Sequence, residues 1–186
     1  MTKPHRQIVA IMFTDVVGYS AWVQRNEAEA LEMLKLHWAL LRPVFGRFDG
    51  REIKTIGDAF LIEFPSALQA VRAGVEMQAA LEKHNRDTEP DRHIRIRIGI
   101  HTGDVERVGK DMFGDGVNIA SRIESLAPPG GICISEAVYA AVQNKIEVPF
   151  YSLGMQHLKN ISQTVVVYCD RPAPGRKLSS QRSLAS

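Results

Sequence analysis

The chain has 186 residues, 45% of them hydrophobic and 24% charged, and its formal net charge is +2. This length is enough for one domain with a substantial core, and the composition is that of an ordinary soluble protein. No hydrophobic segment approaches the roughly 20 residues that span a bilayer, and the apolar run after residues 1–6 covers only residues 8–14. We therefore expect no signal peptide and no membrane insertion.

The positive charge lies at the C-terminal end. Residues 171–186 hold four of the 23 basic residues and none of the 21 acidic ones, so the rest has 19 basic against 21 acidic residues. A domain that binds nucleic acid is expected to carry its own basic face, so we expect no nucleic-acid partner. We predict a folded domain over residues 1–170 and a disordered, basic tail with Ser and Pro over residues 171–186.

The two cysteines, Cys133 and Cys169, lie far apart in strand-like segments. They lack the Cys-x-x-Cys spacing that is typical of a zinc site. We expect two buried free thiols in a reducing compartment, and therefore a cytoplasmic protein.

The first predicted element is a strand over residues 7–13, which is apolar on both faces, as a covered central strand would be. It ends at Asp15. Gly18 then permits a tight turn, and Ser20 is placed to cap a short helix whose first N–H groups would form a phosphate site. An ordinary strand-to-helix connection explains the same residues, so this segment alone is weak support for a site.

Two helices are predicted next, on either side of a hairpin. Apolar residues spaced three and four apart predict a helix over residues 26–48, with Asn26 as its N-cap. We expect Pro43 to kink this helix or to end its regular part. The second helix begins at Ser66, where Ser66 and Gln69 have the spacing of a capping box.

The hairpin over residues 51–64 has its turn at Gly57 and Asp58, because Gly supplies the positive φ that such turns need. An aspartate at a hairpin tip is usually only a turn residue. Asp15 favours a functional role for Asp58, since Asp15 also lies at the end of a predicted strand. Two carboxylates at the ends of neighbouring strands, beside a Gly-containing turn, could hold divalent metal and phosphate.

Isoleucines at alternate positions predict a strand over residues 94–101, covered on one face. His101 is expected to be structural, because nothing nearby in the sequence makes a triad or a metal pair with it. A helix follows from about Val117, and on it Asn118 and Arg122 share one face. Taken singly, the asparagine is usually a cap, and the arginine is usually a solvated partner for an acid.

The remaining elements are a strand, a short helix and two strands, at residues 132–135, 136–142, 146–153 and 164–169. The order β-α-β-β-α-β followed by α-β-α-β-β predicts an α+β fold. We expect a ferredoxin-like, palm-like core with a C-terminal αβαββ extension. This topology would bring Asp15 and the hairpin together.

Four motifs, at residues 13–20, 54–60, 99–103 and 111–122, together resemble the catalytic domain of class III nucleotidyl cyclases. The resemblance covers about residues 7–169. It implies an adenylate cyclase that converts ATP to 3′,5′-cyclic AMP and pyrophosphate, with two Mg²⁺ or Mn²⁺ ions in each active site. It also implies a homodimer in which each site draws its metal ligands from one subunit and its base-reading residues from the other.

Carried over residue by residue, the resemblance makes Asp15, Asp58 and the Val16 carbonyl the metal ligands. Lys54 and Asp111 match the pair that reads the purine edge. Lys54 is donor-only and suits adenine N1, whereas ionised Asp111 accepts from the N6 amine. Guanine presents the reverse pattern, so this pair favours ATP over GTP.

Asn118 and Arg122 match the residues that orient the ribose and stabilise the transition state in this family. Lys159, between the last two predicted strands, resembles the phosphate-binding lysine. Gly18 and Tyr19 are further substrate-binding candidates in the turn after the first strand. Two alternatives remain at this stage. A palm-domain diguanylate cyclase is disfavoured because residues 57–60 lack its Gly-Gly-acidic signature, and a degenerate cyclase domain would serve only in dimerisation or nucleotide sensing.

Overall fold

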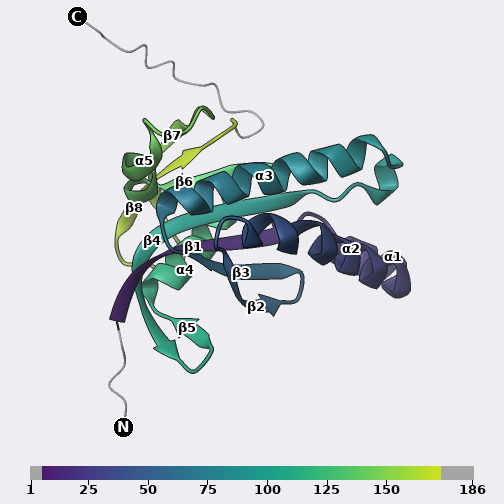
Figure 1. Ribbon diagram of the computed structural model, residues 1–186, viewed down its shortest axis with the longest axis horizontal. Coiled ribbons are helices and arrows are strands. Elements are labelled where there is room, and N and C mark those ends of the chain that lie inside the picture. Colours follow the sequence, from purple (N-terminus) through teal and green to yellow (C-terminus); the bar gives the residue numbers. More distant parts are fainter. Residues whose placement is uncertain (1–5, 173–186) are drawn as a thin grey trace, which may run out of the picture.

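An eight-stranded sheet with the order β2-β3-β1-β4-β6-β8-β7 forms the centre of the molecule, and β5 pairs with β4 outside that path (Figure 1). The computed structural model describes residues 6–172. The strands are β1 Arg6–Val16, β2 Arg51–Ile56, β3 Ala59–Phe64, β4 Ile96–Val108, β5 Asp111–Phe113, β6 Ile132–Ser135, β7 Tyr151–His157 and β8 Thr164–Cys169. The helices are α1 Tyr19–Arg25, α2 Glu27–Gly46, α3 Ala67–Arg86, α4 Asp115–Glu124 and α5 Glu136–Val142, with a 3-10 turn η1 at Pro90–Arg92.

The predicted α+β fold with a ferredoxin-like core is confirmed. Strand β1 runs antiparallel to both β3 and β4, and β2 pairs with β3 at the edge. This is the 2-3-1-4 order of a βαββαβ unit. The extension adds β6 parallel to β4, followed by β8 and β7.

Helices cover both faces of the sheet. Helices α2, α3 and α5 pack on the face to which Met12 and Ile98 belong. Helix α4 packs on the other face, against Ile11 and Phe13 through Ala120. Successive residues of a strand point to opposite faces, so a strand in this position must be apolar throughout.

The helix caps follow the sequence closely. The Asn26 side chain accepts a hydrogen bond from the backbone N–H of Glu29, and Ser66 accepts one from Gln69, each at 3.2 Å. Helix α2 continues to Gly46, so Pro43 lies within its last turn. The predicted cap at Ser20 is wrong. Gly18, with φ of 76°, is the N-cap of α1, because the turn after β1 needs a left-handed residue there.

Strands β4 and β7 differ most from their predicted limits, and β5 is an additional strand. Strand β4 runs to Val108 because its second half pairs with the start of β1, up to the Arg6–Glu106 pair. The short strand β5 was not predicted, since it forms only by pairing with the end of β4. Strand β7 begins at Tyr151, because its limits are set by its antiparallel pairing with β8.

The expectation of two free thiols is wrong. Cys133 on β6 and Cys169 on β8 are directly opposed across the sheet, with their Cα atoms 4.2 Å apart, and they form a disulfide. Both side chains are buried, as expected. The sequence separation of 36 hides this pairing, because only the strand register makes the two cysteines neighbours.

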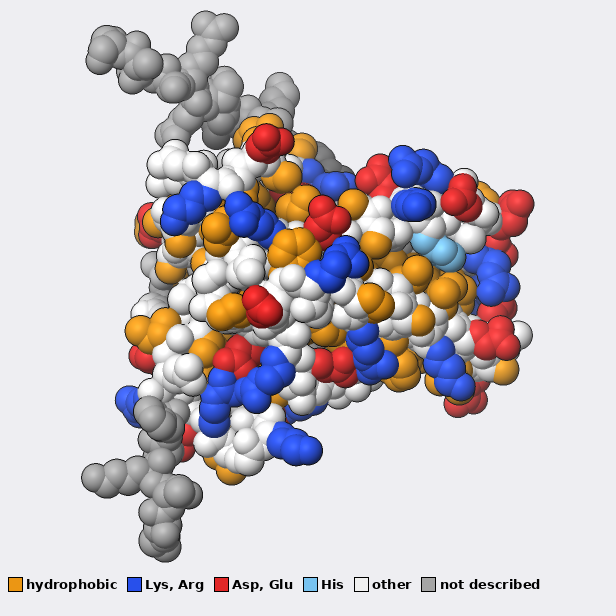
Figure 2. Space-filling model, viewed as in Figure 1, with side chains coloured by type: hydrophobic (Ala, Val, Ile, Leu, Met, Phe, Trp, Pro, Cys, Tyr) orange, Lys and Arg blue, Asp and Glu red, His pale blue; other side chains and the backbone are white. Residues whose placement is uncertain are grey.

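Charged side chains of both signs are interspersed on the face shown in Figure 2, and no single basic patch dominates it. Within residues 6–172, no helix is long and apolar enough to cross a membrane. Most of the predicted tail lies outside the described residues.

Candidate active site

The carboxylates of Asp15 and Asp58 meet at one end of the sheet. Asp15 is near the end of β1, and Asp58 is in the β2–β3 turn, where Gly57 has φ of 61°. The turn is fixed to β1 by two hydrogen bonds. The backbone N–H of Val16 donates to Asp58 Oδ2 at 2.9 Å, and the buried Thr14 hydroxyl accepts from the Phe60 N–H at 3.2 Å.

The electrostatics of this pair favour a bound cation. Burial, together with the hydrogen bond and the charge of Asp58, raises the pKa of Asp15 to about 6. Arg97, directly opposite Asp15 on β4, opposes this rise, and its Nη1 lies 3.5 Å from Asp15 Oδ2. Two neighbouring carboxylates repel each other, so a divalent cation would relieve the repulsion.

The donor set here suits Mg²⁺ or Mn²⁺. Asp15 and Asp58 offer carboxylate oxygens, and hard cations of this kind prefer oxygen ligands. In the described part of the chain, no three His, Cys, Asp or Glu residues are grouped as a metal cage. An ion at the two carboxylates would therefore take its remaining ligands from water or from substrate phosphates.

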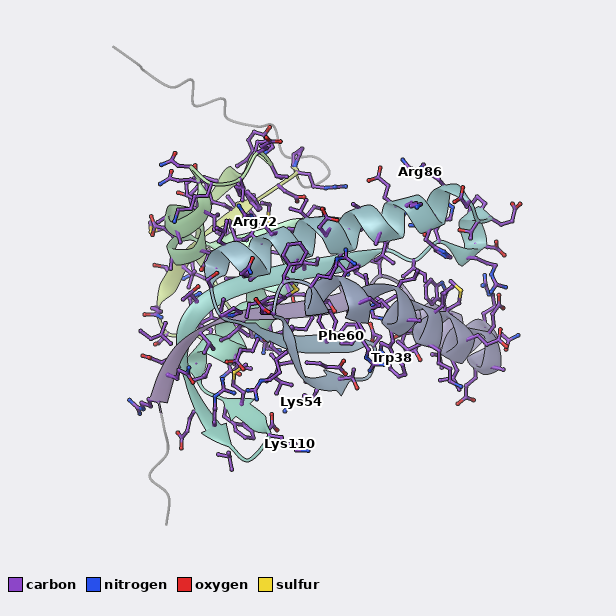
Figure 3. All side chains as sticks on the ribbon, in the orientation of Figure 1. Trp38, Lys54, Phe60, Arg72, Arg86 and Lys110 are labelled. Carbon is purple, nitrogen blue, oxygen red and sulfur yellow. A yellow bond between two sulfur atoms is a disulfide. The ribbon has the colours of Figure 1, made fainter. Side chains whose placement is uncertain are left out.

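Lys54 and Asp111 form an ion pair, although they are 57 positions apart in the sequence. Lys54 Nζ lies 2.8 Å from Asp111 Oδ2, and Asp111 Oδ1 accepts from the Met112 N–H at 2.7 Å. The hydrogen bond from Lys54, followed by that from Met112, lowers the pKa of Asp111. The Phe113 ring lies 5.4 Å from the Lys54 ammonium, within cation–π range. Lys54 thus projects from β2 toward the β4–β5 hairpin, in which Lys110 lies (Figure 3).

A β-bulge in β2 sets the position of Lys54. Glu52 pairs with Ile62 and Lys54 with Leu61, so Ile53 is the extra residue between them. A bulge changes which side chain faces each side of a sheet, so strict alternation along the sequence cannot place Lys54 correctly.

Asn118 and Arg122 lie one turn apart on α4. Asn118 is exposed and Arg122 is half-buried, and among residues 6–172 neither side chain has a hydrogen-bond or ion-pair partner in the structure. Gly114 is the N-cap of α4, so Asn118 does not cap the helix. Both side chains are therefore available to a ligand.

Helix α4 approaches β4 closely because Gly99 has no side chain. A Cβ built on Gly99 would lie 2.2 Å from the Glu124 backbone N and 2.7 Å from the Ala120 carbonyl oxygen. Glycine at this position therefore sets the distance of Asn118 and Arg122 from the sheet.

Within the described part of one chain, no hydrogen bond or ion pair links the other predicted site side chains to these groups. Lys159 is exposed between β7 and β8. Tyr19 is half-buried and packs edge-on against Trp22, with ring centroids 6.4 Å apart. His101 contacts Ser135 Oγ through Nδ1 at 2.9 Å, and burial lowers its pKa to about 4, which agrees with a structural role.

Sequence reasoning missed Arg97 and Glu124. Arg97 contacts Asp15, and the partly buried Glu124 carboxylate faces Asp15, Asp58 and Arg97 from α4. Arg97 alternates with buried isoleucines, so the sequence marks it only as the outward face of a strand. Its position opposite Asp15 depends on the register of β1 and β4.

Comparison with known proteins identifies the family. Residues 1–169 match the adenylate and guanylate cyclase catalytic domain. The chain is 39% identical over 168 residues to putative adenylate cyclase 3 of Rhizobium meliloti, which covers 90% of this chain. It spans only 29% of that relative's length.

Solved structures show the same architecture. An adenylate/guanylate cyclase/hydrolase from Silicibacter pomeroyi matches with a TM-score of 0.85 and 37% identity, over 92% of this chain and all of that one. The adenylyl cyclase CyaB from P. aeruginosa matches with a TM-score of 0.78 and 25% identity, over 90% of this chain and 95% of that one. The chain therefore belongs to the family of adenylate and guanylate cyclase catalytic domains.

Proposed function

We propose that this domain is an adenylate cyclase that converts ATP to 3′,5′-cyclic AMP and pyrophosphate. The Lys54–Asp111 pair is the observation that carries this choice of substrate. It presents a donor beside an acceptor, which complements N1 and N6 of adenine. Guanine would place an acceptor against Asp111 and a donor against Lys54, and an unpaired polar edge is strongly rejected.

Asp15, Asp58 and the Val16 carbonyl would hold two Mg²⁺ or Mn²⁺ ions. Such ions supply charge neutralisation for the triphosphate and assist the in-line attack of the ribose 3′-oxygen on the α-phosphorus. Lys159 would add a further positive charge toward the phosphates from the β7–β8 loop.

Arg122 would stabilise the charge that develops on the transferring phosphoryl group, and Asn118 would orient the ribose. Gly18 and Tyr19 would line the turn on which the phosphates rest. The absence of a competing protein partner for Asn118 and Arg122 among the described residues supports these roles.

A homodimer with shared active sites would complete each constellation. Ile56, Val108 and Phe113 are large apolar side chains that are 50% or more exposed, at the ends of β2, β4 and β5. The Phe113 ring lies 5.4 Å from the Lys54 ammonium, and burial of these three side chains against a second subunit would remove their apolar surface from water. A twofold axis would bring Asn118 and Arg122 of one subunit to the metal-binding end of the other and form two equivalent sites.

The test is direct. The purified chain is incubated with ATP or GTP, each with Mg²⁺ or Mn²⁺, and the cyclic product is measured. We expect cyclic AMP from ATP, little product from GTP, and none after chelation of the metal.

Asp15→Asn should abolish turnover, whereas Asp49→Asn, a matched change at an exposed turn, should not. A dimeric, manganese-loaded preparation that binds ATP but leaves it intact would instead support a degenerate domain that senses nucleotide or mediates dimerisation. Preferential use of GTP would refute the assignment of the base-reading pair.

A further inference from the structure

Glu124 is a carboxylate in an unusual place. It is the last residue of α4, and it lies on the same helical face as the buried Ala120, four residues earlier. Its backbone rests on Gly99, which lies two residues after Arg97 and on the same face of β4. Glu124 therefore lies near the end of the sheet at which Asp15 and Arg97 meet.

The Glu124 carboxylate is poorly compensated. Its Oε1 is buried and has no hydrogen-bond partner among the described residues. The charged groups that face it are Asp15, Arg97 and Asp58, and the two aspartates repel it. Burial, followed by the charge of Asp15, raises its pKa to about 8, whereas Arg97 opposes that rise. A carboxylate that is kept buried without a partner needs a functional or structural reason.

Among residues 6–172, Arg97 is the one positive group whose charge acts on both Asp15 and Glu124. In the structure it contacts Asp15 Oδ2 at 3.5 Å and makes no ion pair with Glu124. Divalent cations bound at Asp15 and Asp58 would repel the Arg97 guanidinium, since like charges at a few ångströms disfavour each other. Glu124, whose pKa Arg97 already lowers, is then a carboxylate that could receive it, and the closer approach of the guanidinium would favour the ionised form of Glu124.

We propose that Glu124 is a positioning residue for the metal-binding end of the site, because it attracts Arg97 away from Asp15 and so frees Asp15 to bind a divalent cation. This inference rests on the proposed function. The proposal concerns the affinity for metal, and it does not require Glu124 to touch the nucleotide.

The test measures Mn²⁺ binding to the full chain by the electron paramagnetic resonance signal of the free ion. 3′-deoxy-ATP, which cannot cyclise but itself binds Mn²⁺, is present throughout at one fixed concentration, and the Mn²⁺ that it binds without protein is measured separately and subtracted. Glu124→Gln keeps the shape of the side chain and removes its charge. We expect it to weaken Mn²⁺ binding about tenfold, the usual cost of losing a group that orients a metal ligand. Glu76→Gln, an exposed change on α3, is the matched control and should leave binding unchanged.

A second comparison, made in an Arg97→Gln protein, separates the positioning of Arg97 from a direct effect of the Glu124 charge on the metal. In an Arg97→Gln protein there is no guanidinium to attract, so Glu124→Gln should have little further effect on Mn²⁺ affinity. An equal loss in both backgrounds, or no loss in the first, would overturn the inference. Glu124→Asp keeps the charge, so it should retain more Mn²⁺ affinity than Glu124→Gln if both fold, and thermal melts verify folding.

A failure of the proposed function would give a different result from a failure of this inference. If the wild-type chain with nucleotide binds no Mn²⁺, then the metal assignment itself is wrong and this inference is overturned with it. If the wild-type chain binds Mn²⁺ and makes cyclic AMP, but Glu124→Gln binds it equally well, only the positioning role is refuted.

Discussion

The close packing of α4 on β4 predicts opposite effects for the same substitution at two glycines. At Gly99, an added Cβ would lie 2.2 Å from the Glu124 backbone N and 2.5 Å from its Cα. At Gly74, in the middle of α3, the nearest atoms are side-chain carbons of Ile132 and Met12 at 3.5 Å, which is ordinary contact. The first site is overpacked by alanine, and the second has room for it.

The magnitudes follow from these distances. Gly74→Ala should stabilise the fold by about 0.5–1 kcal/mol, because alanine loses less backbone entropy in a helix. Gly99→Ala should destabilise it by about 1–3 kcal/mol, since backbone atoms must move. To reach even a tight 3.4 Å contact, the Cβ–N separation at Gly99 must grow from 2.2 Å, so α4 must shift by roughly 1 Å.

This shift should also reduce activity, because α4 carries Asn118 and Arg122. A displacement of roughly 1 Å in a catalytic group can lower the rate by about 100-fold. The assays are urea unfolding, from which the change in the free energy of unfolding is obtained, and cyclic AMP production at saturating ATP. Gly99→Ala and Gly74→Ala proteins with equal stability, or a Gly99→Ala enzyme with full turnover, would refute the argument.

Four further outcomes can be tested. Asp58→Ala and Arg122→Ala proteins should each be inactive. A mixed dimer has one intact composite site of two, and random mixing makes half of the dimers mixed, so roughly a quarter of the activity should return. No recovery in verified heterodimers would contradict shared sites. Lys54→Glu should lower ATP turnover by orders of magnitude because it places an acceptor against N1, and an unchanged ATP-to-GTP ratio would contradict base reading. Asn26→Ala should lower the free energy of unfolding by about 1 kcal/mol through loss of the cap on α2, measured in urea. Glu124 has a pKa of about 8 in the fold against an ordinary 4.5, so between these pH values the folded state keeps a proton that the unfolded chain loses. The free energy of unfolding should therefore fall as the pH rises from about 4.5 to about 8. Glu124→Gln should reduce this fall, as measured by urea unfolding at pH 5 and pH 8.

Much of the fold could be predicted because its signals are local. The caps at Asn26 and Ser66 each act within three residues, and the structure confirms both. The hairpin at Gly57 follows from one positive φ between two β-rich runs. The fold class then followed from the order of elements. Within the candidate site, the motif around Asp15 and the pair Asn118 and Arg122 were identified in the same way, from short segments.

The remaining features depend on contacts between distant segments. Strand β5 has only three residues, and no period can reveal it, yet it brings Asp111 to Lys54. The ion pair also depends on the bulge at Ile53, which breaks the alternation on which a sequence prediction relies. The prediction of two free thiols is wrong, because only the pairing of β6 with β8 brings the two cysteines together.

The sequence by itself determined the helices, the core strands, the family resemblance and the residue types of a nucleotide site, because each of these is written within a few neighbouring residues. The tertiary structure alone decided which charges meet. Asp15 lies opposite Arg97 only through the register of β1 and β4, and Glu124 faces them only because Gly99 allows α4 to approach the sheet. Register and close approach are properties of the packed chain, since they depend on how distant segments fit together.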